Sequence, residues 1–169
     1  GDAYPGGGVH PCHWSDQVTR AAPSKAWLAT FTRRWHCNPD MCHTIDPVGG
    51  HSARMGILAL ELFGADASRE LLVACLTHDL GEYMTGDVAW PAKQDRELAD
   101  ALDRIEACAL ADMGMLFDLN RPIDQRRLKY LDRLDAYLWT QHHRPDILNR
   151  DGWPEYLAWL EAAWAEVRP

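Results

Sequence analysis

The stretch Leu71-Leu-Val-Ala-Cys-Leu-Thr-His-Asp-Leu-Gly-Glu82 combines an apolar helical pattern with an imidazole and a carboxylate side by side. Charged side chains avoid apolar runs of this kind unless a partner compensates for their burial. For His78 beside Asp79, a divalent metal ion is a suitable partner, because imidazole and carboxylate both bind such ions. The stretch therefore predicts a helix that carries a pair of metal ligands, and it directs attention to where further ligands could come from.

The rest of the chain continues the helical pattern. Apolar residues recur at intervals of three and four, and no segment alternates as a half-buried strand would. Caps and breakers divide this pattern into helices near residues 24–35, 51–64, 68–81, 93–110, 122–138 and 151–167. Loops are expected at 38–50 and 83–91, where Pro and Gly interrupt the pattern. The sequence thus predicts an all-α fold, a compact bundle of about six helices.

Length and composition bound the organisation of the chain. With 169 residues, 47% of them hydrophobic and 25% charged, we expect a single domain over 15–169 after a flexible N-terminal lead-in at 1–14. The net charge of −8 argues against a nucleic-acid polymer as partner, although a small phosphate-bearing molecule needs only local positive charge. No apolar stretch is long enough to predict a membrane partner.

The cysteines indicate a reducing compartment. Five is an odd number, which argues against a closed disulfide framework. Cys75 and Cys108 lie in apolar helical patterns that are typical of buried thiols. We therefore expect a cytoplasmic protein.

A metal centre needs ligands from several segments, and the chain offers them. His51 opens the second predicted helix, and the late helix carries Asp132 and Asp135 among leucines. With His78-Asp79 these residues suit Zn, Mn, Co, Fe or Mg, and the residue types choose neither among the ions nor between the two late aspartates. A simpler interpretation stays open at this point, because a buried histidine is often a hydrogen-bonded core residue and a His-Asp pair can end a helix in solvent.

Glu82 and three basic residues suggest chemistry near such an ion. Glu82 lies within four residues of the His-Asp pair, near the same side of a helix end. A carboxylate there is placed to hold or deprotonate a water whose pKa the metal lowers, although a surface glutamate would leave the same pattern. Three basic residues are candidates to pair with the negatively charged oxygens of a phosphoryl group: Arg34, Lys93 and Lys129.

The order of these motifs resembles a known family. His51, then His78-Asp79, then a distant aspartate is similar to the pattern of the HD-domain metal-dependent phosphohydrolases, an all-helical superfamily. The chain also carries Arg34-Trp35, His78-Asp-Leu-Gly-Glu82, Thr85-Gly-Asp87 and Pro91-Ala-Lys93, which look like motifs of the 5′-deoxynucleotidase branch. That branch includes short phage enzymes that hydrolyse dATP. The shared motifs span residues 33–138, so the resemblance implies a compact HD-domain helical bundle.

The resemblance implies a ligand set and a catalytic residue. The segment Lys129-Tyr-Leu-Asp132-Arg-Leu-Asp135-Ala-Tyr137 is similar to the family helix in which the final ligand lies four residues before an Ala-Tyr pair. It selects Asp132 and leaves Asp135 as a surface or helix-pairing carboxylate. One divalent metal per site is therefore implied, held by His51, His78, Asp79 and Asp132. Glu82 would assist the attacking water, so Glu82 and Asp79 are the implied catalytic residues.

The same resemblance implies how a deoxynucleotide would be held. The three basic residues named above stand where family members contact phosphate. Trp35 resembles the tryptophan that packs on the sugar and disfavours a ribose 2′-hydroxyl, since burying that hydroxyl unpaired is unfavourable. Asp87 resembles the residue that accepts a hydrogen bond from the sugar 3′-hydroxyl. Pro91 and the loop 37–45 are expected to border the base, but this loop is unusual, so a base preference does not carry over.

The resemblance leads to one expected function and two alternatives. We expect a dNTP triphosphohydrolase that releases deoxynucleoside and triphosphate, because the chain is short, offers three cations and has Arg34-Trp-His36 like the phage enzymes. A 5′-deoxynucleotidase that converts dNMP to deoxynucleoside and phosphate is the alternative, since the same ligands serve either reaction. A non-catalytic nucleotide-binding HD sensor is a third candidate, although such a protein would normally have lost a ligand or Glu82. The family forms dimers or larger rings, so we expect a homo-oligomer (a dimer or hexamer), acting in the host cytoplasm if a phage encodes it.

The loop before the second predicted helix suggests a separate metal site. Four residues separate Cys37 from Cys42, with His36 and His43 beside them and Cys12-His13 further away. Such a set could bind a structural zinc ion, although loop cysteines without a metal are commoner.

Overall fold

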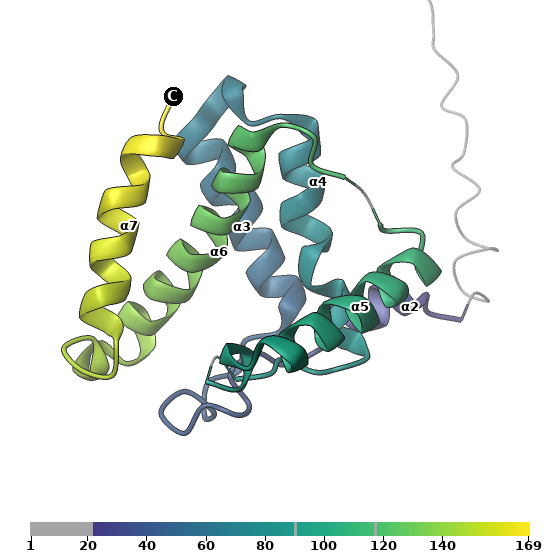
Figure 1. Ribbon diagram of the computed structural model, residues 1–169, viewed down its shortest axis with the longest axis horizontal. Coiled ribbons are helices and arrows are strands. Elements are labelled where there is room, and N and C mark those ends of the chain that lie inside the picture. The colour runs from purple at the N-terminus through teal and green to yellow at the C-terminus, as the bar shows by residue number, and fades with distance from the viewer. Residues whose placement is uncertain (1–21, 90, 117) are drawn as a thin grey trace, which may run out of the picture.

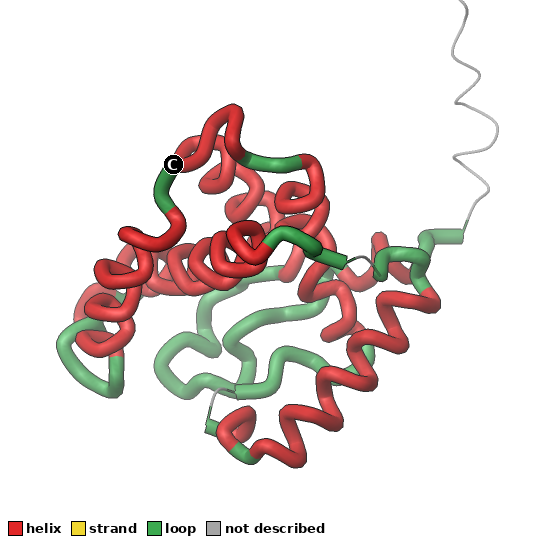
Figure 2. The backbone as a smooth tube through the Cα atoms, turned by 45° about the horizontal axis from the view of Figure 1, so that its top comes forward, coloured by secondary structure: helices red, strands yellow, loops and turns green. Residues whose placement is uncertain are grey.

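The computed structural model describes residues 22–89, 91–116 and 118–169, and in this part of the chain the regular structure is helical (Figures 1 and 2). The predicted all-α fold is confirmed, whereas the predicted lead-in at 1–14 lies outside the described residues. The α-helices are α2 (Lys25–Ala29), α3 (Val48–Phe63), α4 (Arg69–Thr77), α5 (Arg96–Asp112), α6 (Pro122–His143) and α7 (Trp153–Val167). Short 3-10 helices are η1 (Gly64–Asp66), η2 (His78–Tyr83), η3 (Ala92–Gln94) and η4 (Pro145–Ile147). None of the described helices is long and apolar enough to cross a membrane.

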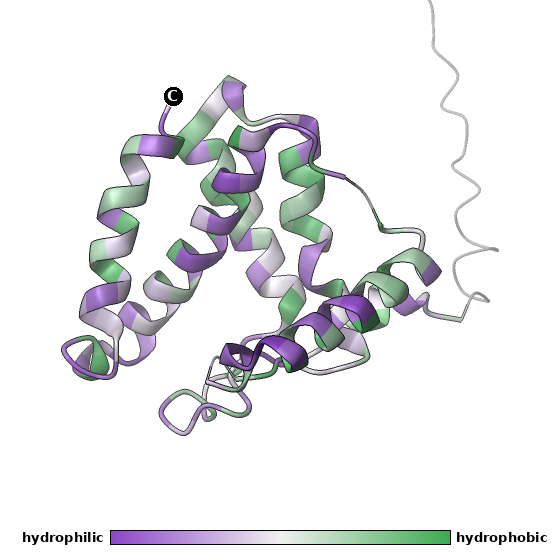
Figure 3. Cartoon of the chain, viewed as in Figure 1, coloured by the Kyte–Doolittle hydropathy of each residue, from purple (hydrophilic) through white to green (hydrophobic). Residues whose placement is uncertain are grey.

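The core lies between the four helices α3, α4, α6 and α7, with the long α6 in contact with the other three. Figure 3 shows apolar and polar residues interleaved along these helices, as expected where one face of each is buried. The buried core side chains are Met55, Ala59, Phe63, Leu71, Cys75, Tyr130, Leu131, Leu160 and Val167. Helix α5 lies to one side of this group and packs on η2, the segment that follows α4 (Figure 1). The core thus fixes α3, α4 and α6, the three helices around the His-Asp pair.

The first predicted helix is wrong in its length. α2 ends at Ala29, whereas the pattern predicted helix to residue 35. The reason is tertiary pairing: the backbone N–H groups of Gly49 and Val48 donate to the carbonyls of Thr30 and Thr32 at 2.9 and 2.8 Å. A bridge between Arg33 and Pro47 continues this pairing. The segment after α2 is therefore held in an extended form beside the start of α3, which begins at Val48 rather than at residue 51.

The helix that carries the His-Asp pair changes its type at that pair. α4 ends at Thr77, and the chain continues as the 3-10 helix η2 from His78. At Gly81 an added Cβ would meet the backbone oxygen of Glu106 at 2.7 Å, so α5 approaches the backbone of η2 closely and glycine is needed there. Cys75 is buried as predicted, but Cys108 on α5 is exposed, because α5 contacts the body of the protein through one face only.

Candidate metal centre

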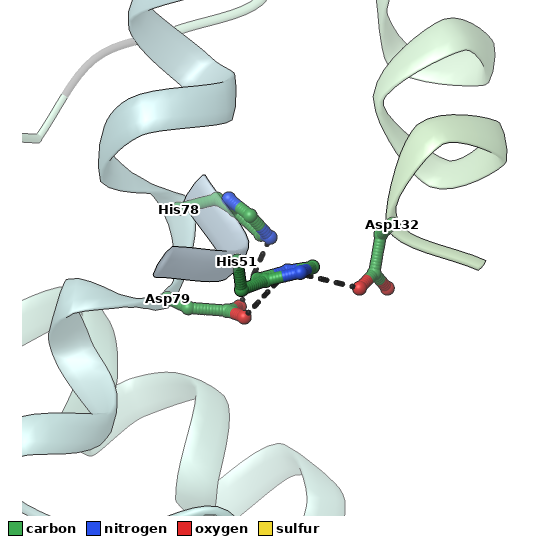
Figure 4. A group of neighbouring side chains, drawn as sticks. All are labelled: His51, His78, Asp79 and Asp132. Atoms are coloured by element: carbon green, nitrogen blue, oxygen red, sulfur yellow. Dashed lines mark ion pairs between the residues drawn. The ribbon is translucent and has the colours of Figure 1, made fainter. Parts of the chain in front are cut away.

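Four of the predicted site residues come together from three elements. His51 comes from α3, His78 and Asp79 from η2, and Asp132 from α6, and one ligand atom of each lies within 4.8 Å of the others (Figure 4). His51 Nε2 lies 3.3 Å from Asp79 Oδ2 and 3.4 Å from Asp132 Oδ1. His78 Nε2 lies 3.2 Å from Asp79 Oδ1. This is the sole group of its kind among the described residues.

The two histidines direct the same nitrogen toward the centre. His78 Nδ1 lies 3.1 Å from the carbonyl oxygen of Ala74, which can only accept, so Nδ1 carries a hydrogen and Nε2 is left as the ligand atom. His51 Nδ1 lies 2.8 Å from Asp135 Oδ2. Both Nε2 atoms are buried and make no hydrogen bond with the described residues. Buried polar atoms without a partner are costly, and a divalent ion among two nitrogens and two carboxylates would satisfy them.

His51 and the aspartates of the centre shift one another's pKa values toward their charged forms. Burial opposes the charged form of His51, but the carboxylates of Asp132, Asp135 and Asp79 outweigh burial and raise the pKa of His51 to about 10. Burial likewise opposes the ionised form of Asp79, yet His78 and His51 hold the pKa of this carboxyl well below its usual range. The pKa of Asp132 is also lowered, in spite of burial, mainly through His51. The centre therefore favours positive charge between its carboxylates.

Glu82 is buried beside the centre. Its Oε1 lies 3.6 Å from Lys93 Nζ, and its Oε2 is buried and makes no hydrogen bond with the described residues. Burial is the main reason that the pKa of Glu82 is raised to about 9, and the charges of Asp79 and Asp87 raise it further. Glu82 is thus a carboxyl with an unused oxygen, in electrostatic contact with the metal-ligand candidate Asp79.

The residues predicted to hold the sugar and phosphate are only partly gathered here. Arg34 is buried, and its Nη2 lies 3.7 Å from Asp132 Oδ1. The backbone N–H of Trp35 donates to Asp87 Oδ2 at 2.6 Å, and this contact holds Trp35 in a left-handed conformation, with φ 65°. The tryptophan and Asp87 therefore share one small structural unit that borders Arg34.

Two predicted substrate residues lie apart from this group. Pro91 is exposed at the start of η3. Lys129 is exposed on α6, with its Nζ 5.9 Å from the centre of the Trp159 ring on α7, instead of toward the ligands. Lys129 lies one turn before Asp132 on α6, as the spacing indicated, but its ammonium lies beside a ring of α7, and sequence spacing does not record how α7 packs on α6.

Sequence reasoning missed Asp46 and Arg54, and the hydrogen bonds through which Arg54 joins Asp46 to Asp135 behind the centre. Asp46 is fully buried, Asp135 is 2% exposed, and Arg54 lies between them. Of the two roles expected for Asp135, the surface role is wrong and the helix-pairing role is confirmed, because this carboxylate contacts His51 and joins α6 to α3. A signal was present: Asp132 and Asp135, like His51 and Arg54, are three residues apart and so share a helix face.

The cysteine loop forms no second centre among the described residues. Cys37 and Cys42 are exposed free thiols, and the Cys42 thiol lies 3.7 Å from the carbonyl oxygen of Pro39. His36 and His43 do not join them in a metal-binding group within the described residues. Cys12 and His13, the other predicted participants, lie outside those residues.

The fold and the centre together define an all-helical protein with a His2Asp2 candidate metal site. No family model, no curated protein and no solved structure matches this chain.

Proposed function

We propose that this protein is a divalent-metal-dependent phosphohydrolase of the HD-domain class that acts on 2′-deoxynucleotides. The observation that carries the proposal is the convergence of His51, His78, Asp79 and Asp132, with the Nε2 atoms of both histidines buried and without a hydrogen-bond partner among the described residues. A divalent ion held by these residues would lower the pKa of a water molecule and neutralise phosphate oxygens.

Glu82 is the proposed general base. Its buried Oε2 has no hydrogen-bond partner in the described part of the chain, so it is free to accept a proton from the attacking water. Burial and the charge of Asp79 raise the pKa of Glu82 to about 9, and a divalent ion that offsets the charge of Asp79 would lower this pKa toward the ionised form that the role requires, which Lys93 also favours. The water attacks the phosphorus that carries the 5′ oxygen, the bond from phosphorus to that oxygen breaks, and the departing deoxynucleoside oxygen takes up a proton.

Arg34 and Trp35 are the proposed contacts of the substrate. The Arg34 guanidinium lies at the edge of the ligand group, where it can donate hydrogen bonds to phosphoryl oxygens. Trp35 is half-buried beside it and offers an apolar wall for the deoxyribose. With a dNTP the products are deoxynucleoside and triphosphate, and we propose this reaction first.

A 5′-deoxynucleotidase is the second candidate, and one observation favours it. The triphosphate reaction was expected partly because three cations could surround the phosphates. Lys129 lies over the Trp159 ring, and Arg34 is already paired with buried carboxylates. A smaller supply of free positive charge suits a monophosphate, which would yield deoxynucleoside and inorganic phosphate.

The test is product analysis with the purified, metal-loaded protein. Separate incubations with dNTPs and dNMPs, read by chromatography and phosphate assay, should give triphosphate from the former or orthophosphate from the latter. His78→Ala should abolish either activity, whereas His142→Ala, an exposed histidine on the same protein, should leave it unchanged. Binding of deoxynucleotide without turnover would favour a non-catalytic sensor, and full turnover by His78→Ala would reject the metal mechanism.

A further inference from the structure

The two aspartates of α6 reach the two nitrogens of one imidazole. Asp132 and Asp135 are one helical turn apart and project from the same face of α6. Asp132 Oδ1 lies 3.4 Å from His51 Nε2, on the side of the candidate metal ligands (Figure 4). Asp135 Oδ2 lies 2.8 Å from His51 Nδ1, on the opposite side of the ring. The imidazole is therefore held between two carboxylates that differ in position and partners.

Asp135 is itself held in place. Arg54 donates from Nε to Asp135 Oδ1 at 2.7 Å and from Nη2 to Oδ2 at 2.9 Å, which is a bidentate contact. Arg34 Nη1 donates to the same Oδ2 at 3.3 Å. The Trp139 ring lies 4.4 Å from the Arg54 guanidinium carbon and packs on this pair. With 2% exposure and three donor groups around it, the Asp135 carboxylate has little freedom to leave His51.

Asp46 completes the network without touching His51. Its carboxylate accepts from Arg54 Nη2 at 2.8 Å and from Arg34 Nη1 at 3.3 Å, and it is fully buried. Both arginines are thus shared between Asp46 and Asp135. Asp46 also accepts from the indole Nε1 of Trp35 at 3.2 Å. The two carboxylates have the same arginine partners, and of the two only Asp135 contacts the imidazole.

We propose that Asp135 is a positioning residue of the metal centre: by accepting the Nδ1 hydrogen of His51 it fixes the ring so that Nε2 faces the ion. This inference rests on the proposed function, because it assumes that a divalent ion occupies the centre. A histidine ligand whose second nitrogen is held by a carboxylate is better oriented and more basic than a free one. Asp135 acts through His51, whereas Asp132 belongs to the ligand group itself.

The test compares Asp135→Asn with Asp46→Asn as a matched control. Each variant removes one buried carboxylate charge from the same pair of arginines, and only the first disturbs the His51 contact. Titration calorimetry with Zn²⁺ should show that Asp135→Asn weakens binding about 10- to 100-fold, the range for loss of such a partner. Asp46→Asn should change it by less than about threefold, since it leaves His51 and its neighbours in contact. Equal losses in both variants would overturn the positioning role.

A second measurement needs no variant and separates this inference from the proposed function. In the Zn²⁺-loaded wild-type protein with ¹⁵N-labelled histidine, nuclear magnetic resonance should show His51 protonated at Nδ1 and coordinated through Nε2. Coordination through Nδ1 would overturn the role of Asp135 while leaving the metal centre intact. A wild-type protein that binds no divalent ion would overturn the metal centre and the positioning role together.

Discussion

Metal binding should release protons, and the structure sets how many. In the metal-free protein the pKa values of His51 and Glu82 are about 10 and about 9, so both groups carry a proton near neutral pH. His51 must lose one proton to bind an ion through Nε2. Glu82 should lose part of its proton, because an ion beside Asp79 cancels a negative charge that raises the pKa of Glu82. We expect between one and two protons released per ion, and one in Glu82→Gln.

The magnitude of the pH dependence follows from the proton count. In Glu82→Gln, one released proton makes the affinity rise about tenfold per pH unit, or about 1.4 kcal/mol, until the pKa of His51 is approached. Calorimetry with Mn²⁺ in two buffers of different ionisation enthalpy at the same pH gives the proton count directly. His142→Ala serves as the control and should match the wild type. A wild-type count near zero, with an affinity that is flat between about pH 7 and pH 8.5, would refute the assignment of a proton to His51.

Three further outcomes are expected. Because His51 and the neighbouring Glu82 hold protons more tightly in the folded chain, chelator-treated protein should lose stability as pH rises from 6.5 toward about 10. Thermal melts should show a smaller loss when metal is bound. Gly81→Ala should lower the free energy of unfolding in urea by about 1–3 kcal/mol, because the added Cβ meets Glu106. Gly56→Ala, in open space on α3, should raise it by about 0.5–1 kcal/mol. Equal effects of the two substitutions would contradict the close approach of α5 to η2. Asp87→Ala should lower the free energy of unfolding by about 1 kcal/mol or more, because the backbone N–H of Trp35 loses its acceptor. The same substitution should raise KM for the deoxynucleotide. An unchanged unfolding curve would show that this hydrogen bond does not stabilise the fold.

The local sequence pattern predicted the long helices correctly. It failed where backbone hydrogen bonds join two segments that are separated in the sequence. α6 runs from Pro122 for 22 residues, and its apolar spacing and first-turn proline both appear in the sequence. The segment after α2 has a similar spacing, but its backbone hydrogen bonds go to residues 46–49 at the start of α3. No local pattern contains that information. The change from α4 to η2 at His78 was missed for a related reason, because periods of 3.6 and 3.0 differ too little over six residues.

The sequence likewise predicted some residues of the candidate site and not others. The residue types left Asp132 and Asp135 as alternatives, the family resemblance selected Asp132 beside His51, His78 and Asp79, and the structure gathers these four. The residues behind them were not foreseen, since a buried Asp135 looks like a surface aspartate until its partners across α3 are known. Ion pairs between residues 81 and 101 positions apart depend on how helices pack, which one-dimensional spacing does not record.

The side chains around His51 favour a positive charge at the centre. Leu131 is fully buried in the core, and the next residue of α6, Asp132, faces the centre, so packing of α6 also fixes the position of a carboxylate. Asp79 and Asp132 are held near each other, although the negative charge of Asp79 opposes ionisation of Asp132 and raises its pKa. In the absence of an ion, a proton on His51 supplies the compensating charge. A divalent cation would replace that proton with a larger charge at the same place, so the force that raises the pKa of His51 is the same force that would bind the metal.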